Sequence, residues 1–242
     1  MRLFLRTIRT YTLFLFVSLI FSSLCVPLTF LPKRIRYKNK FYFFLTYLWS
    51  KILLLTSFTR IKIEGKQNLV KYLKEPAIFV MNHVSFLDIL LTEIILKNRP
   101  HVWISKKELG SIPVLRILLK RMHVLVQRES SGMAARALVK AYNLAKTHKS
   151  HILLFPEGTR YADGQIHEFL NGFAVLSKKL NRQVYPIAIL GVHKVLPKKS
   201  FIFNSKGNEI RLVIGEPFSY IDNESEEEFT KRVHDWFKKC MS

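Results

Sequence analysis

The sequence predicts an α/β protein with a mixed, mostly parallel-type sheet, helices on both faces, and an N-terminal hydrophobic, membrane-associated helical segment. Three observations support this prediction. From residue 60 onward, short apolar runs typical of strands alternate with longer helical patterns. Two of these runs end abruptly in polar residues, as strands do when they carry a site at their carboxyl ends. Near the N-terminus, an uncharged stretch is long enough to cross a bilayer.

The uncharged stretch is expected to hold the protein at a membrane. It runs from Thr10 to Pro32 with basic residues on both sides, so the positive-inside rule does not fix an orientation. A cleaved signal peptide is the main alternative, although its apolar region is normally shorter. Pro27 and Pro32 leave a re-entrant hairpin open as well. We predict membrane-anchoring helices over residues 1–60 and a folded domain over residues 61–242.

A second apolar and aromatic-rich segment runs from Phe41 to Phe58. We expect an interfacial helix whose tyrosine and tryptophan side chains lie at the level of the lipid head groups. A helix packed on the core of the domain and a second membrane span are the alternatives.

The remaining elements follow from hydrophobic periodicity and turn residues. Strands are predicted at Arg60–Gly65, Ala77–Met81, His101–Ser105, His123–Gln127, His151–Phe155 and Val184–Leu190, with a late edge strand at Ile210–Ile214. Helical segments are predicted at Gln67–Leu73, Ile89–Leu96, Val114–Met122, Ser131–Thr147, Phe173–Leu180 and Glu224–Phe237.

The composition restricts the classes of function. The net charge of +22 suits a protein that meets nucleic acid or an anionic membrane, and charge alone does not separate the two. No helix-turn-helix, zinc or RNA-binding signature supports nucleic acid as a partner. Cys25 and Cys240 suggest no disulfide framework, and His148 and His151 have no cysteine or carboxylate cluster beside them, so we expect no metal site.

The first polar strand end carries His83 and Asp88. A neutral imidazole is the usual base for an alcohol near neutral pH, and a carboxylate on its second nitrogen makes it more effective. Positions i and i+5 point about 140° apart on one helix, so the two side chains meet only if His83 precedes the helix that holds Asp88. Ser85 is predicted to be the N-cap of that helix. The spacing by itself is weak evidence for function.

The second polar strand end carries Glu157, Gly158, Thr159 and Arg160. Glycine permits a sharp turn and a close approach to the backbone, and arginine offers a planar fork that matches phosphate oxygens. The same residues are also ordinary turn chemistry. The presence of both strand ends in one chain, in this order, favours a site.

These residues together resemble the glycerolipid acyltransferases. Asn82, His83 and Asp88 are similar to the NHx4D block of that family, and Phe155–Arg160 matches its FPEGTR block without a mismatch. Lys106–Pro113 with Val124–Arg128 resembles the second block, and Val184–Ile189 resembles the fourth. The resemblance covers roughly residues 75–190 and is closest to the 1-acylglycerol-3-phosphate, or lysophosphatidic acid, acyltransferases.

The resemblance implies an O-acyltransferase domain over residues 61–242. His83 would be the general base and Asp88 would orient it. The base would activate the sn-2 hydroxyl of lysophosphatidic acid toward an acyl thioester of coenzyme A or acyl-carrier protein, without a cofactor or an acyl-enzyme. Arg128, Glu157, Gly158, Thr159 and Arg160 would bind the acceptor. The family also implies an N-terminal helical pair that docks the domain on one leaflet, with the active site at the cytoplasmic face.

One position departs from the family pattern. Family members often have a lysine where this chain has Leu170, shortly before Gly172. Lys178 and Lys179 follow one to two helical turns later. The missing cation leaves another lysolipid, such as a lyso-ornithine lipid or a different lysophospholipid, as the alternative acceptor.

Overall fold

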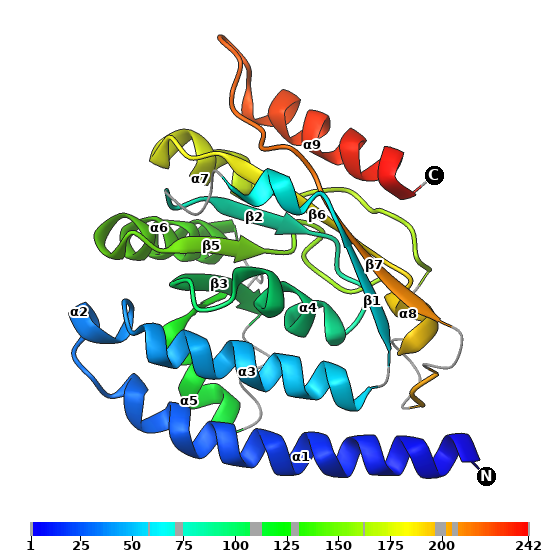
Figure 1. The fold of residues 1–242 in the computed structure, drawn as a ribbon. Helices are drawn as coiled ribbons and strands as arrows, with labels where there is room; N and C mark the ends of the chain where they lie inside the picture. Colours follow the sequence, from blue (N-terminus) through cyan, green and yellow to red (C-terminus); the bar gives the residue numbers. More distant parts are fainter. Residues whose placement is uncertain are drawn as a thin grey trace.

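The computed structural model describes residues 2–57, 59–70, 75–106, 113–126, 131–161, 163–196, 202–204 and 208–241. One seven-stranded sheet forms the centre of the fold, helices cover both of its faces, and a pair of N-terminal helices lies along one side (Figure 1). This arrangement confirms the predicted fold class.

The sheet is mixed. Its strands are β1 (Arg60–Glu64), β2 (Ile78–Met81), β3 (His101–Lys106), β4 (Val124–Val126), β5 (His151–Leu154), β6 (Val184–Leu190) and β7 (Glu209–Ile214). They are arranged in the order β1-β7-β6-β2-β5-β3-β4. Every pair of neighbours is parallel except β6 and β7.

The predicted edge position of the strand at 210–214 was wrong. In the structure β7 lies inside the sheet, between β1 and β6. Buried and exposed residues alternate along β7, as they do in many edge strands. Its interior position depends on β1, which pairs with it from a distant part of the chain, and local alternation carries no information about that partner.

The helices surround this sheet. They are α1 (Arg2–Thr29), α2 (Lys33–Arg36), α3 (Lys40–Thr56), α4 (Leu87–Leu96), α5 (Pro113–Met122), α6 (Ser131–His148), α7 (Gly172–Leu180), α8 (Val192–Val195) and α9 (Glu226–Met241). The described part of the helical turn predicted at Gln67–Leu73 belongs to a 3₁₀ helix, η1 (Lys66–Val70), and residues 71–73 lie outside the described residues.

Two hydrophobic cores flank the sheet, because successive residues of a strand point to opposite faces. Phe79 and Met81 of β2 pack with apolar residues of α3, α4 and α8. Ile78 and Val80 pack with apolar residues of α6, α7 and α9. All four side chains are fully buried, which fixes the register of β2 and hence the position at which the strand ends.

The carboxyl ends of β2 and β5 lie side by side at the point where the chain connections diverge. β2 pairs with β5 on one side and with β6 on the other. From β2 the chain passes through α4 to β3, and from β5 it passes through α7 back across β2 to β6. Ligands of open α/β sheets bind in the crevice at such a switch point.

The N-terminal helices α1 and α3 form an antiparallel pair beside the sheet (Figure 1). α1 continues through Pro27 to Thr29, so this proline does not break the helix. Of the described helices, α1 over Phe4–Thr29 is the one long and apolar enough to cross a membrane, a test that a signal sequence also passes. The predicted boundary at residue 60 falls between α3 and β1, and the division into two domains stays a prediction.

One face of α1 is covered and the other is open. Large apolar side chains of α1 are exposed at Phe4, Leu5, Ile8, Leu15, Phe16, Leu19, Ile20 and Leu24, a spacing that forms one stripe along the helix. On the covered face Phe14 and Val17 pack against the core. The exposed stripe supports the membrane association of this segment.

The segment Phe41–Phe58 contains most of α3, and α3 packs on the core of the domain, which was the alternative to an interfacial helix. Tyr42, Phe43 and Leu53 are buried. The Trp49 indole N–H donates a hydrogen bond to Ser18 Oγ on α1 at 3.0 Å, so this tryptophan faces its helical partner. Whether the exposed side of α3 also meets lipid stays a prediction.

Candidate active site

His83 and Asp88 meet at the end of β2. His83 Nδ1 lies 2.9 Å from Asp88 Oδ2. His83 precedes α4 and Asp88 lies in its first turn, as the i,i+5 geometry requires. α4 begins at Leu87 with Phe86 in the N-cap position, so the predicted cap at Ser85 was wrong by one residue.

Asp88 is completely buried and organises the loop before α4. Its Oδ2 atom also accepts the backbone N–H groups of Val84, at 2.6 Å, and Ser85, at 2.7 Å. A carboxylate oxygen accepts hydrogen bonds, so His83 donates through Nδ1 and carries its lone pair on Nε2. The Nε2 nitrogen of His83 therefore has no hydrogen-bond partner among the described groups, on a ring that is partly exposed, with 16% of the side chain accessible.

A flat aromatic ring fixes the plane of the imidazole. Phe155, the first residue after β5, stacks on His83 with a centroid distance of 3.9 Å and an interplanar angle of 9°. Sequence reasoning quoted Phe155 as part of a motif but assigned it no role. Its role could have been suspected from its position, because Phe155 follows one buried strand directly and His83 follows the neighbouring strand.

Glu157 joins the two strand ends. Its Oε1 atom accepts the backbone N–H of His83 at 3.0 Å. Burial raises the pKa of Glu157 to about 7, and the nearby Asp88 adds to the rise, while the backbone N–H groups of His83 and His167 oppose it. The hydrogen bond of this carboxylate to the His83 backbone was not predicted from the sequence. Its predicted role as a substrate ligand stays a prediction.

The turn after Glu157 has the form that glycine permits. Gly158 has φ +71°, in the left-handed region, and its N–H bonds to the carbonyl of Phe155 at 3.1 Å. Gly158 is buried, whereas Thr159 and Arg160 are half-buried at the same strand end as His83. The backbone N–H of Tyr161 then donates to the carbonyl of His83 at 3.1 Å, which ties the two loops together a second time.

The predicted site residues His83, Asp88, Glu157, Gly158, Thr159 and Arg160 thus gather at the adjoining ends of β2 and β5. Arg128 lies outside the described residues, as does most of the second motif between Lys107 and Ile112.

Asn82 is a positioning residue that the sequence did not reveal. Its side-chain amide donates to the carbonyl of Ile189 at 2.9 Å and accepts the Ile189 N–H at 2.7 Å. These two bonds replace the sheet ladder one residue beyond the end of β2. The backbone of His83 is therefore anchored to β6 on one side and to Glu157 on the other.

The two lysines after Leu170 lie away from the site. Lys178 pairs with Glu226 at 3.3 Å, and Lys179 lines a cavity with Lys146 and Arg182 at the C-terminal end of α7. Leu170 is itself 53% exposed. Neither lysine therefore replaces the cation that the family pattern places at Leu170.

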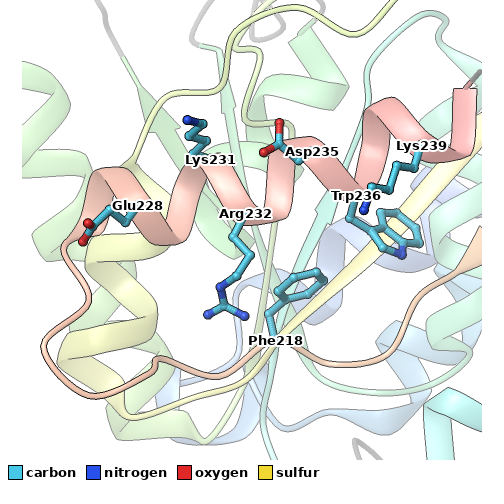
Figure 2. Close-up of a pocket in the computed structure, with 7 residues that line it drawn as sticks. All are labelled: Phe218, Glu228, Lys231, Arg232, Asp235, Trp236 and Lys239. Atoms are coloured by element: carbon cyan, nitrogen blue, oxygen red, sulfur yellow. The ribbon is translucent and has the colours of Figure 1, made fainter.

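Other candidate sites in the described chain carry less chemistry. No group of three or more metal-ligating side chains occurs among the described residues. A cavity of about 430 Å³ lies beside α9, with Phe218 and Trp236 among its walls (Figure 2). Its Arg232 is already held by Glu224 at 2.7 Å, and it shares no residue with the ends of β2 and β5. The strand ends are the better candidate.

Comparison with known proteins identifies the family. The model of the Acyltransferase family matches residues 60–190, which include β1 to β6 and both strand ends. This chain belongs to the Acyltransferase family. The match confirms the resemblance to an acyltransferase family seen in the sequence.

Relatives of this family member include named lipid acyltransferases. The chain is 33% identical over 182 residues to a chloroplastic 1-acyl-sn-glycerol-3-phosphate acyltransferase of Arabidopsis thaliana, covering 75% of this chain and 49% of the relative. It is 33% identical over 156 residues to the 1-acyl-sn-glycerol-3-phosphate acyltransferase of Borreliella burgdorferi, covering 64% and 60%. The chain spans about half the length of the plant relatives it matches.

A solved structure has the same fold over nearly the whole chain. The crystal structure of PlsC, the 1-acyl-sn-glycerophosphate acyltransferase of Thermotoga maritima, aligns with a TM-score of 0.78 and 27% sequence identity. The alignment covers 99% of this chain and 95% of that one. The likeness therefore extends beyond the family match to the N-terminal helices and α9.

Proposed function

We propose that this protein transfers an acyl chain from a thioester donor to the sn-2 hydroxyl of lysophosphatidic acid and releases phosphatidic acid. The observation that carries the proposal is the partly exposed His83 imidazole, whose Nδ1 is held by Asp88 while Nε2 has no partner among the described groups. The named relatives and the PlsC structure support the choice of acceptor. Acyl-coenzyme A and acyl-carrier protein are the proposed donors.

The first step is removal of the hydroxyl proton. His83 Nε2 takes the proton as the acceptor oxygen attacks the thioester carbonyl carbon, and the carbonyl electron pair moves onto oxygen. Asp88 stabilises the imidazolium that forms and keeps the ring in the required tautomer. The three hydrogen bonds to Asp88 Oδ2 hold the carboxylate in place during this change of charge.

The second step expels the thiol. The tetrahedral intermediate re-forms its carbonyl, the carbon–sulfur bond breaks, and the thiolate takes the proton from His83. The new oxygen ester and the free thiol leave, and the imidazole is again neutral. No acyl-enzyme is needed, and neither Cys25, which is buried in α1, nor Cys240 in α9 belongs to the strand ends.

The acceptor phosphate is assigned to the arginines. Arg160 follows the Gly158 turn at the end of β5, and its guanidinium fork suits phosphate oxygens. Arg128 is proposed as the second phosphate ligand on the strength of its place in the motif. Glu157 acts in this proposal as a positioning residue, because it bonds to the backbone of His83.

The proposed acceptor is a lipid, and several contacts connect the site to the apolar helix α1. Ser85 Oγ donates to the carbonyl of Leu196 at 3.1 Å, and Phe203 N–H donates to Thr7 Oγ1 of α1 at 3.2 Å. Phe203 also contacts the ring of Tyr11 with a centroid distance of 5.3 Å. The site would therefore open next to the bilayer that holds the exposed stripe of α1, at the cytoplasmic face where acyl thioesters are available.

The test is acyl transfer by the purified full chain in detergent or lipid nanodiscs, with lysophosphatidic acid and an acyl thioester. We expect phosphatidic acid from the wild-type protein. His83→Ala should lower kcat by about 10²–10⁴-fold, the usual contribution of a general base. His148→Ala, at the end of α6, is the control and should retain activity. Equal product from the wild type and His83→Ala would reject the mechanism.

A different lysolipid acceptor is the second candidate. It is favoured by the positions of Lys178 and Lys179, which leave the missing cation at Leu170 without a replacement. A panel of lysophosphatidic acid, other lysophospholipids and a lyso-ornithine lipid separates the two. If phosphate is recognised, Arg160→Ala and Arg128→Ala should lower kcat/KM for lysophosphatidic acid much more than for the lyso-ornithine lipid, which carries no phosphate.

A further inference from the structure

A polar cluster is buried behind the active site, between α3, α4 and β3. Glu93 of α4 lies at its centre and is 4% exposed. Its Oε1 atom accepts from His101 Nε2 at 2.9 Å and from the Trp103 indole N–H at 3.0 Å. Its Oε2 atom accepts from Thr46 Oγ1 of α3 at 3.1 Å. None of these groups takes part in the proposed acyl transfer.

The cluster holds a buried ion pair. Burial alone would raise the pKa of Glu93, but the charge and hydrogen bonds of His101 and Trp103 lower it below its usual value. Burial likewise opposes a charged His101, yet Glu93 raises the pKa of that ring. Replacing such a pair by apolar residues is often neutral or stabilising. Stability alone therefore does not explain why this ion pair is present.

Trp103 is held from two directions. Besides the indole bond to Glu93, its backbone N–H donates to His123 Nδ1 at 3.2 Å. Burial lowers the pKa of His123 to about 3, so that ring is neutral and accepts the bond. The Trp103 side chain is 5% exposed and has little freedom to turn.

The far side of Trp103 connects this cluster to the active site. The Trp103 ring stacks on Phe155 with a centroid distance of 5.3 Å and an interplanar angle of 28°. Phe155 in turn stacks on His83 at 3.9 Å. The order of contacts is therefore Thr46, Glu93, Trp103, Phe155 and His83.

We infer that Trp103 is a positioning residue for the His83 imidazole, acting through Phe155, and that Thr46 ties the N-terminal helix α3 to the same stack. The inference deepens the proposed function and rests on His83 being its base. Asp88 bonds to one atom of the imidazole, which leaves rotation about the Nδ1–Oδ2 direction unrestrained. The face of Phe155 removes that freedom, and Trp103 keeps Phe155 from moving away.

The expected effect follows from packing. Protein interiors are close-packed, so a smaller ring at position 103 leaves space into which Phe155 can relax. Misplacement of a reacting group by about 1 Å can cost about 10²-fold in rate. In this inference the buried ion pair fixes the orientation of the Trp103 indole, which a purely apolar pocket would leave free to rotate.

The test compares two identical changes in one core. Trp103→Phe removes the indole that backs Phe155. Trp49→Phe is the matched control, since Trp49 packs against the same core while its indole N–H bonds to Ser18 on α1 instead of to Glu93. We expect Trp103→Phe to lower kcat by about 10-fold to 100-fold with little change in KM, and Trp49→Phe to retain kcat.

A readout on His83 itself does not depend on turnover. In imidazole NMR spectra, with the His83 signals assigned by their loss in His83→Ala, Trp103→Phe should shift the His83 ring signals, because the aromatic ring stacked on the imidazole moves. Trp49→Phe should leave them unchanged. Unchanged His83 signals, or wild-type kcat, in folded Trp103→Phe would overturn the inference. If the wild type transfers no acyl chain, the proposed function fails, while the spectra still decide whether Trp103 positions the ring.

A second pair tests the link to α3 and keeps the inference open to refutation if Trp103→Phe does not fold. Thr46→Val deletes the hydroxyl that bonds to Glu93, and Thr56→Val on the same helix deletes a hydroxyl that bonds to the backbone of Leu53. Thr46→Val should shift the His83 signals in the same direction as Trp103→Phe and by less. Identical spectra for the two threonine variants would remove α3 from the proposal.

Discussion

Two histidine–carboxylate pairs in this protein have the same length and opposite uses. His83 and Asp88 lie 2.9 Å apart, and so do His101 and Glu93. His83 uses one ring nitrogen to bond its carboxylate, and the other has no partner among the described groups on a side chain that is partly exposed. His101 uses both, since Nε2 bonds to Glu93 and Nδ1 to the carbonyl of Arg99 at 2.9 Å. Only the first ring has a lone pair free for chemistry.

A third pair sharpens the comparison. His167 and Asp163 lie 2.7 Å apart on the loop after the Gly158 turn, with side chains 31% and 45% exposed. The shortest pair is thus the most exposed, where water competes for both partners. The distance between ring and carboxylate does not identify a base. A base is identified by a ring nitrogen without a hydrogen-bond partner, by the access of substrate to that nitrogen, and by the contacts that hold the ring.

The largest expected effect concerns the pair at the site. Asp88→Asn keeps the shape of the side chain but removes the charge that stabilises the imidazolium. We expect kcat to fall by at least about 10²-fold while the protein remains folded. Steady-state kinetics together with circular dichroism would check this. Wild-type kcat in a folded Asp88→Asn protein would remove the distinction between the two buried pairs.

The next effect concerns stability instead of rate. Glu93→Ala leaves His101 buried without its partner, and breaking a buried pair costs about 3–5 kcal/mol. Asp163→Ala breaks the exposed pair and should change the free energy of unfolding by less than about 1 kcal/mol. Chemical denaturation of both variants in the same detergent measures the difference. Equal losses would show that burial does not separate these pairs.

The smallest effect concerns the carboxylate that joins the two loops. The pKa of Glu157 is raised from 4.5 to about 7, so the folded state binds more protons than the unfolded state between these values. The stability contribution of Glu157 is therefore full below about pH 4.5 and is lost as the pH rises through about 7, with a slope of at most about 1.4 kcal/mol per pH unit. Solvent screening reduces this limit because the carboxyl is not fully desolvated.

Glu157→Gln provides the measurement. The amide oxygen can still accept the backbone N–H of His83, but it does not titrate. The free energy of unfolding of Glu157→Gln relative to wild type should therefore rise between pH 5 and pH 8. A difference that stays constant over this range would contradict the raised pKa.

Several features of the fold were predictable because their causes are local. The runs at Ala77–Met81 and Ile152–Phe155 are apolar and are followed by polar residues, which indicates buried strands with a site at their ends. The i,i+5 spacing of His83 and Asp88 correctly placed the histidine before the helix. The polar residues after the two strands could also be expected to meet, because the carboxyl ends of neighbouring parallel strands lie at the same edge of a sheet.

Other features depend on partners that are distant in sequence. The sheet position of β7 is set by β1, and the stack on His83 is set by Phe155 and Trp103 from two other strands. In the sequence, Glu93 is a polar residue in a mostly apolar helix. Its partners in the buried cluster, His101 and Trp103, come from β3 and are not indicated by the local pattern. Periodicity reports which face of an element is covered, but it does not report which element covers it.

The pairing of β1 with β7 has a consequence for biosynthesis. β1 has β7 as its neighbour in the described sheet, and β7 leaves the ribosome after every other strand. The apolar helices α1 and α3 are likewise translated before α4 and α5, the helices that they contact in the fold. A nascent chain therefore carries β1 without its sheet partner until β7 has been made, so the domain can close only late in synthesis.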